Sequence, residues 1–396
     1  MDGAVALCRN EAVDVYRAMN GRFAAILLSA VLVIVPASLR AGEVFLQFRD
    51  LQQISGGQFL AAGLKPPEQD RSLPIVRDTA TDPALDLLRS LDGRGVAHGF
   101  DGILYDNRDR GHSSLPSDLF PRLINLKYGL ELQVDKSDFG LAGAIVHRDI
   151  VFGNSSTALT GGPRARSQTR LAMTAPELAR RSAVLYLTNH IYVYPEHRDY
   201  DEVDRYPARW PYHIISYGSS GSDQPFLRAI AATLAAFRED TLSFMKENGL
   251  VATTFEMILR RNLKQVAIAQ DYFKPAAHRP VLTGEELRPL RMVSHAAALG
   301  PEDIPPSVRL QVINEDFGDA AGLLHLEERL FDTPSAIARI WRGFSGTKEI
   351  VVSAAGTRYP TGQPLEFAWH ILQGDPGKIS IEPMDAQGRV ARITLD

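Results

Sequence analysis

The sequence of 396 residues has one cysteine, Cys8, and no surplus of basic residues. Lysines and arginines number 43 against 47 aspartates and glutamates, so the formal net charge is −4. Nucleic-acid-binding proteins usually carry a basic surplus, and this balance therefore argues against nucleic acid as a partner. A single cysteine also leaves no internal disulfide and no thiolate metal cluster.

The sequence also lacks an apolar run of the roughly 20 residues that a membrane-spanning helix needs. The shorter apolar run at residues 23–35 follows Arg22 and precedes small residues around Ala37 and Ala41, which is typical of a signal peptide. We therefore expect residues 1–41 to be an export signal, cleaved after Ala37 or Ala41. The protein is accordingly predicted to be exported, into the periplasm or the extracellular space.

The expected cleavage removes Cys8, so the mature protein would contain no cysteine nucleophile. Translation from Met19 would shorten the leader, and retention of the apolar run as an uncleaved anchor is the alternative to cleavage. The predicted contact with a membrane is through this segment alone.

No repeat or low-complexity tract interrupts the rest of the chain, which is 45% hydrophobic and 23% charged overall, as in globular proteins. Residues 42–332 alternate short apolar runs with polar loops and helical patterns, which predicts an α/β domain with a mixed or parallel sheet. A helical extension is expected within residues 223–300. Strands are expected at residues 44–46, 102–105, 123–126, 130–134, 142–147, 150–152, 191–194, 213–217 and 308–313, and helices at 81–88, 176–188, 223–238, 241–248, 254–261 and 287–299.

Residues 333–396 change to short alternating strands with Gly and Pro turns, expected at residues 350–352, 365–369, 378–381 and 389–393. The stretch 351–369, with its Pro-x-Gly turn and Trp369, resembles polycystic-kidney-disease-type immunoglobulin-like modules. That resemblance implies a small all-β sandwich with a buried tryptophan, and a spacer or adhesive role. The module would be short, with its final strand either missing or supplied by another segment.

A second resemblance covers most of residues 95–396. The segments at 104–113, 192–198 and 218–226 look like those of uncharacterised exported proteins of planctomycete-like bacteria. This resemblance implies export and carries no activity with it.

Polar side chains follow four of the expected strands, where ligands bind in open α/β sheets. If these strands are parallel neighbours, the loops 106–114, 153–157, 196–201 and 218–223 form one cleft for a polar ligand such as a glycan or an anionic ester. The expected ligand-binding residues are Asp106, Arg108, Arg110, Asn154, Ser155, Arg198, Ser219, Ser222 and Asp223. Tyr192 and Tyr194 either stack on a sugar ring or pack as ordinary strand residues.

Ser220 lies in the turn 218–222, a near match to the nucleophile elbow Gly-x-Ser-x-Gly that lacks the second glycine. A serine hydrolase would use Ser220 as nucleophile, His197 or His112 as base and Asp109 to orient that base. A non-catalytic structural or adhesion protein of the cell envelope is the other alternative. Whether the chain is an enzyme stays open at this point.

The same loops contain carboxylates and imidazoles of the kinds that bind divalent metals. Their spacing fits no metal motif, because Arg108 and Arg110 occupy positions where a calcium loop carries ligands. No cofactor is therefore predicted, and a divalent metal stays an alternative that the spacing does not support. His147, beside Arg148 and Asp149, is expected to be a turn residue rather than a ligand.

Overall fold

The computed structural model describes residues 42–108, 113–132, 145–154, 176–196, 211–219, 221–318, 327–341 and 346–396. The contacts of Leu39–Asp396 group into one unit. Among the residues described, no helix is long and apolar enough to cross a membrane.

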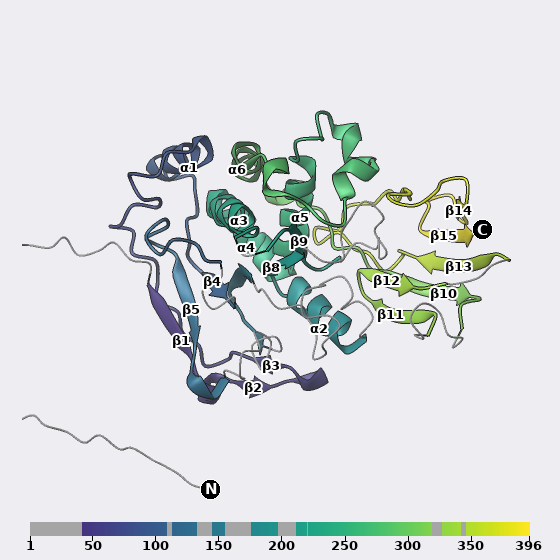
Figure 1. Cartoon of the computed structure of the whole chain (residues 1–396), viewed down its shortest axis with the longest axis horizontal. Helices are drawn as coiled ribbons and strands as arrows, with labels where there is room; N and C mark the ends of the chain where they lie inside the picture. Colours follow the sequence, from purple (N-terminus) through teal and green to yellow (C-terminus); the bar gives the residue numbers. More distant parts are fainter. Residues whose placement is uncertain are drawn as a thin grey trace, which may run out of the picture. The chain divides into compact units, whose positions relative to one another are not determined.

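Six strands form the central sheet, and every pairing between them is parallel (Figure 1). Strands follow the expected apolar runs because these runs are buried, and the predicted α/β class with a parallel sheet is confirmed. In spatial order the strands are β1 (Glu43–Leu46), β5 (Ile124–Tyr128), β4 (Ile103–Asn107), β7 (Ile150–Asn154), β8 (His190–Glu196) and β9 (Ile214–Tyr217).

Helices cover both faces of this sheet (Figure 1). One core packs α1, α3, α5 and α6 against alternate residues of the strands, such as Ile103 and Phe152. The opposite core packs α2 and the later strand β11 against Leu104 and Val151. The helices are α1 (Pro83–Gly93), α2 (Pro176–Leu187), α3 (Gln224–Ala236), α4 (Glu239–Asn248), α5 (Val251–Arg261) and α6 (Pro289–Ala298).

Local signals explain where several helices begin and end. Asp82 caps α1, because its carboxylate accepts the Ala84 backbone N–H at 2.8 Å. Gly249 ends α4 in the left-handed region, with φ at 66°. The expected capping box is present, with the Thr283 N–H donating to the Glu286 carboxylate at 2.6 Å. It caps one 3₁₀ turn, however, and α6 starts only at Pro289.

The strand expected at 130–134 differs from the structure. Leu130–Leu132 is a 3₁₀ turn rather than a strand, and Leu130 is 85% exposed. Residues 142–144 of the strand expected at 142–147 lie outside the described residues. The part that is described, β6 (Ile145–Val146), joins β2 (Gln52–Gln53) and β3 (Phe59–Leu60) in a small sheet. The 3₁₀ segments are η1 (Phe48–Asp50), η2 (Ser55–Gly57), η3 (Leu130–Leu132), η6 (Ala269–Phe273), η7 (Pro275–His278), η8 (Gly284–Glu286) and η9 (Pro301–Asp303).

The C-terminal part contains a four-stranded antiparallel sheet and a separate hairpin. The hairpin spans the expected domain boundary at 332, and the first strand of the sheet comes from before that boundary. In spatial order the sheet is β10 (Gln311–Glu315), β13 (Lys348–Ser353), β15 (Val390–Leu395) and β14 (Ile379–Pro383), and the hairpin is β11 (Arg329–Thr333) with β12 (Ala336–Arg339).

The strand expected at 365–369 is absent. This segment is irregular and pairs with no other strand. Trp369 is half-buried rather than fully buried, and its indole N–H donates to the Gly388 carbonyl at 2.7 Å. This contact anchors the segment to the turn before β15 and takes the place of strand pairing.

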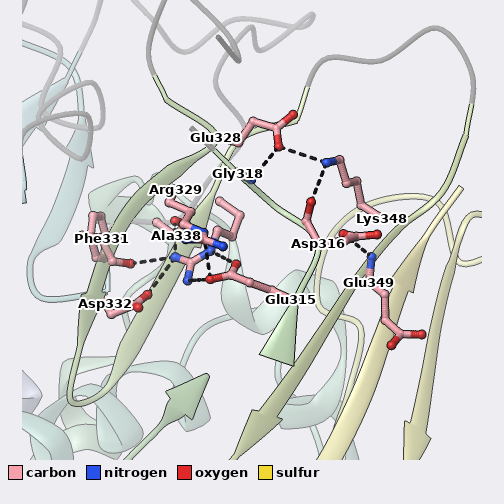
Figure 2. Close-up of polar contacts among 11 residues, drawn as sticks. Glu315, Asp316, Gly318, Glu328, Arg329, Phe331, Asp332, Ala338, Lys348 and Glu349 are labelled. Carbon is pink, nitrogen blue, oxygen red and sulfur yellow. Dashed lines mark hydrogen bonds and ion pairs between the residues drawn. The ribbon is translucent and has the colours of Figure 1, made fainter. Parts of the chain in front are cut away.

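Ion pairs join the hairpin to the antiparallel sheet. Arg339 of β12 donates to both oxygens of Glu315 on β10, at 2.5 and 3.0 Å, and to Asp332 at 2.7 Å. Figure 2 shows Glu328 bound to Lys348 of β13 and to the Gly318 N–H, at 3.0 and 3.1 Å. Because Arg339, Glu315 and Glu328 are largely buried, loss of a partner would leave a charge uncompensated.

We expect Arg339→Met to lower the free energy of unfolding by about 2 kcal/mol, since Glu315 would keep only its 3.1 Å contact with Arg329. Urea denaturation would measure this change. The matched control is Arg392→Met, because Arg392 pairs with the more exposed Glu349 and Glu382 and should cost less than about 0.5 kcal/mol. Equal losses in both variants would contradict the structural role of Arg339.

Candidate functional site

The strand order marks one place on the central sheet. Strand β5 pairs with one side of β4 and β7 pairs with the other, so the path of the chain across the sheet reverses between β4 and β7. Ligands of open parallel sheets bind outside the carboxyl ends of the strands at such a reversal. We call the residues at and just after the carboxyl ends of β4, β7, β8 and β9 the carboxyl edge.

A buried ion pair between Asp106 and Arg108 lies at the end of β4. The Arg108 Nε donates to Asp106 Oδ2 at 2.7 Å, and the two side chains are 1% and 0% exposed. The hydroxyls of Tyr192 and Tyr128 donate to the same oxygen at 2.6 and 2.9 Å. The Arg108 guanidinium also lies 4.2 Å from the centre of the Tyr192 ring. These contacts hold the side chains of Asp106 and Arg108 each in a single conformation.

The surroundings also set the protonation states of this cluster. Burial alone would lower the pKa of Arg108, but the Asp106 carboxylate beside it holds that pKa well above its ordinary value. Burial and then the Asp106 charge raise the pKa of Tyr128 well above its usual range. Burial raises the pKa of Tyr192 in the same way, against the opposing effect of Arg108. Arg108 is therefore a cation, and both tyrosines keep their protons.

Part of the cluster's hydrogen-bonding capacity remains unused. Asp106 Oδ1 and Arg108 Nη1 are buried and have no hydrogen-bond partner among the described residues. An unsatisfied buried polar group costs roughly 1–3 kcal/mol, and more when it is charged. Native structures contain few such groups, so this pair is a candidate for contact with a ligand or an ordered water.

The cluster depends on a glycine in the neighbouring strand. Gly153 of β7 pairs in register with Asp106 on one side and Tyr192 on the other. A Cβ at this position would lie 1.9 Å from the Asp106 carbonyl oxygen and 3.1 Å from the Tyr192 ring. Only glycine leaves room for the Tyr192 hydroxyl to reach across β7 to Asp106.

A second polar group lies on the opposite face of the same edge. Asn154, at the end of β7, donates from Nδ2 to Asp223 Oδ2 at 2.6 Å and to the Ser113 carbonyl at 3.3 Å. Both Asn154 and Asp223 are fully buried. The Arg108 N–H donates to the Asn154 carbonyl at 2.9 Å, which links the two faces. Asp223 Oδ1 also has no hydrogen-bond partner among the described residues.

The turn after β9 contributes the accessible part of the edge. Strand β9, a small-residue turn and α3 follow one another as expected, with Gly218 and Gly221 at φ of 134° and 91°. The Gly221 N–H donates to Ser113 Oγ at 2.7 Å, and Ser222 Oγ lies 3.1 Å from Ser216 Oγ. Ser219 is exposed. The turn thus lies next to the segment that follows β4.

The structure therefore brings Asp106, Arg108, Asn154 and Asp223 together at the carboxyl edge, and Ser219 and Ser222 lie on the turn beside Asp223. The remaining predicted site residues lie outside the described residues, so their positions stay predictions. These are Asp109, Arg110, His112, Ser155, His197, Arg198 and Ser220.

Sequence reasoning missed Tyr128 as a member of this site. It included Ser113 and Gly153 in the cleft loops 106–114 and 153–157 but did not name them as ligand-binding residues. Of the two interpretations of Tyr192 and Tyr194, packing as strand residues agrees with the structure, because each is only 1% exposed. Tyr192 also supplies a hydroxyl to Asp106. The sequence feature that indicates this contact is Gly153, within the apolar run of β7. A glycine inside a strand often marks a place where a ligand or another part of the chain approaches the backbone closely.

Two buried histidines lie beside the cluster. The His147 backbone N–H donates to His190 Nε2 at 3.2 Å, and the two rings are 5.7 Å apart. Burial lowers the pKa of His147 to about 4 and that of His190 well below its usual value. Both rings are therefore neutral at pH 7. Within the described part of the chain, no group of three or more His, Cys, Asp or Glu side chains could hold a metal ion.

Comparisons of the chain with protein-family models, with curated proteins and with solved structures found no match. The function must therefore be argued from the geometry of the site.

Gly153→Ala should lower the free energy of unfolding by about 2 kcal/mol, because the added methyl group overlaps the Asp106 carbonyl. The control is Gly93→Ala at the end of α1, where an added Cβ meets nothing within 4 Å and helix propensity favours alanine by up to about 1 kcal/mol. Urea midpoints would compare the two. A Gly153→Ala protein as stable as the wild type would refute the close approach over β7.

His147 should make the protein less stable in mild acid. Its pKa in the folded state is about 4, whereas an unfolded histidine titrates near about 6.5. The unfolded state therefore takes up the proton first, and about 3 kcal/mol of stability is lost as the pH falls from about 6.5 to about 4.

In His147→Phe the stability lost between about pH 6.5 and about pH 4 should be smaller. The remaining dependence of the unfolding free energy on pH would come from the other titrating groups. Unfolding free energies at several pH values would show this, with each protein referenced to its own value at about pH 7.5, where His147 is neutral in both states. Parallel curves for the two proteins would exclude His147 as the source.

Proposed function

We propose that this protein binds a neutral polyhydroxyl ligand, a glycan or one of its sugar units, at the carboxyl edge. The observation that carries the proposal is the buried pair of Asp106 and Arg108, with Oδ1 and Nη1 unpartnered among the described residues. A hydroxyl group both donates and accepts, so one sugar hydroxyl or two neighbouring ones would satisfy both atoms.

The balance of charge supports a neutral ligand over an anionic ester. The Arg108 cation is already compensated by Asp106 at 2.7 Å. Asp223, whose Oδ1 is also unpartnered among the described residues, brings the formal charge of these three groups to −1. An anion would gain little from Arg108 and would be repelled by Asp223, whereas hydroxyl groups can donate to both carboxylates.

Export and the C-terminal module belong to the same proposal. Export is supported by the apolar run at 23–35 and by β1 starting at Glu43, directly after the expected cleavage at Ala41. An immunoglobulin-like module is supported by the antiparallel sheet and by a small core in which Ile350 and Val352 pack against Ile337 of the hairpin. Such a module would act as a spacer that presents the binding domain.

The test is calorimetric titration of the purified full-length chain with neutral methyl glycosides and, separately, with phosphate. We expect saturable binding of at least one glycoside and none of phosphate. The isosteric variants Asp106→Asn and Asp223→Asn should each weaken it by about tenfold or more, since hydrogen bonds to charged groups contribute roughly 1.5–3 kcal/mol.

Arg122→Lys is the matched control, because Arg122 makes an ion pair of 2.7 Å with Asp92 away from this edge. It should leave the affinity unchanged. If the wild-type protein binds phosphate and Arg108→Lys abolishes that binding, the carboxyl edge is an anion site and the proposal is wrong. Labelling of Ser220 by a fluorophosphonate, together with ester turnover, would favour the hydrolase alternative. Absence of binding to every glycoside would overturn the proposal and leave a structural role.

A further inference from the structure

A pocket of about 320 Å³ lies at the other end of β9 from the carboxyl edge. One wall is a face of α5 that includes Glu256 and Arg260, one helical turn apart. Tyr212, just before β9, and Tyr186 of α2 form a second wall. Small-molecule pockets range over about 300–1,000 Å³, so a ligand of one or two rings would fit.

Aromatic rings line this pocket on two sides. Tyr186 and Tyr212 lie 5.3 Å apart between ring centres, tilted by 60°. Tyr272 and His278, from the 3₁₀ segments after α5, lie 5.0 Å apart in an edge-to-face pair. The Tyr212 hydroxyl is hydrogen-bonded to Thr333 Oγ1, which fixes the ring. The pocket therefore has rigid aromatic sides against which a flat ring can pack.

The charged groups in the wall compensate each other. Arg260 is 2% exposed, and it donates to the Arg279 carbonyl at 2.9 Å and to Glu256 Oε1 at 3.4 Å. Between these two described side chains no net positive charge is left for an anion. A purely apolar ligand would strip water from this pair without replacing its hydrogen bonds. Hydroxyl side chains of Thr253, Ser307 and Ser335 add further donors and acceptors.

We infer that this pocket is a second binding site, for a single neutral sugar ring. A pyranose presents C–H groups on its faces, which suit the electron-rich faces of tyrosine rings, and hydroxyls around its rim, which suit Glu256, Arg260 and the hydroxyl side chains. The site is independent of the carboxyl edge, because it shares no described residue with it.

The test is saturation-transfer NMR and calorimetry on the full-length chain with methyl glucoside, methyl galactoside and the methyl glycoside of N-acetylglucosamine. We expect saturable binding of at least one of these. Tyr272→Ala should weaken it about tenfold by removing one aromatic wall. Val308→Trp should abolish it, because Val308 lines the pocket and is 46% exposed, so that a larger side chain there fills the space without entering the core.

Two controls separate this site from other effects. Tyr359→Ala removes another half-buried tyrosine, in the C-terminal part and outside this pocket, and should leave the affinity unchanged. Arg122→Lys, away from both proposed sites, should also leave the affinity unchanged. Sugar binding that Asp106→Asn weakens but Tyr272→Ala and Val308→Trp do not belongs to the carboxyl edge, so the two proposals can fail separately. Binding of no sugar, or binding that neither Tyr272→Ala nor Val308→Trp weakens, would overturn the inference.

Discussion

Burial of the central strands on both faces is the constraint on which the rest of this structure depends. Parallel strands with helices or other elements on each side must be apolar along most of their length. In β4 and β7 this leaves polar side chains only at the carboxyl ends, where Asp106 and Asn154 are themselves fully buried. Buried polar groups need partners, and here they find them in adjacent strands and at the start of α3. The polar side chains of β4 and β7 are therefore concentrated at one edge of the sheet.

Much of this arrangement could be predicted from the sequence, because the relevant signals are local. The apolar runs of β4, β7, β8 and β9 and the periodicity of α3 each specify their element without reference to the rest of the chain. The errors occurred where local pattern and tertiary packing disagree. Residues 130–134 are apolar enough for a strand, but Leu130 is exposed in a 3₁₀ turn. Residues 365–369 alternate like a strand, but only the side chain of Trp369 is anchored.

The candidate site was predictable to a similar degree and for a similar reason. Asp106, Arg108, Asn154 and Asp223 follow or precede recognisable elements, so their shared location could be expected from a parallel sheet. The residues that form hydrogen bonds with them could not be predicted. Tyr128 and Tyr192 reach Asp106 across 22 and 86 residues of sequence, and that proximity depends on strand order, which no local pattern encodes.

Both proposed sites share an electrostatic character. In each, an arginine is compensated by a neighbouring carboxylate, and tyrosines lie beside the pair. Such a surface discriminates between ligands by the direction of hydrogen bonds rather than by net charge. Buried charges are also screened little by dissolved salt. Recognition at these sites would therefore depend weakly on ionic strength.

The strand β10 has a consequence for how the chain can be divided. It precedes the hairpin in the sequence, yet it pairs with β13 and places Glu315 against Arg339. A fragment starting at residue 333 would lose β10 and most of β11, so β13 would become an unprotected edge strand. Its free N–H and C=O groups could then pair with those of another molecule and promote aggregation. An excised C-terminal fragment must therefore begin before Gln311 to keep its sheet intact.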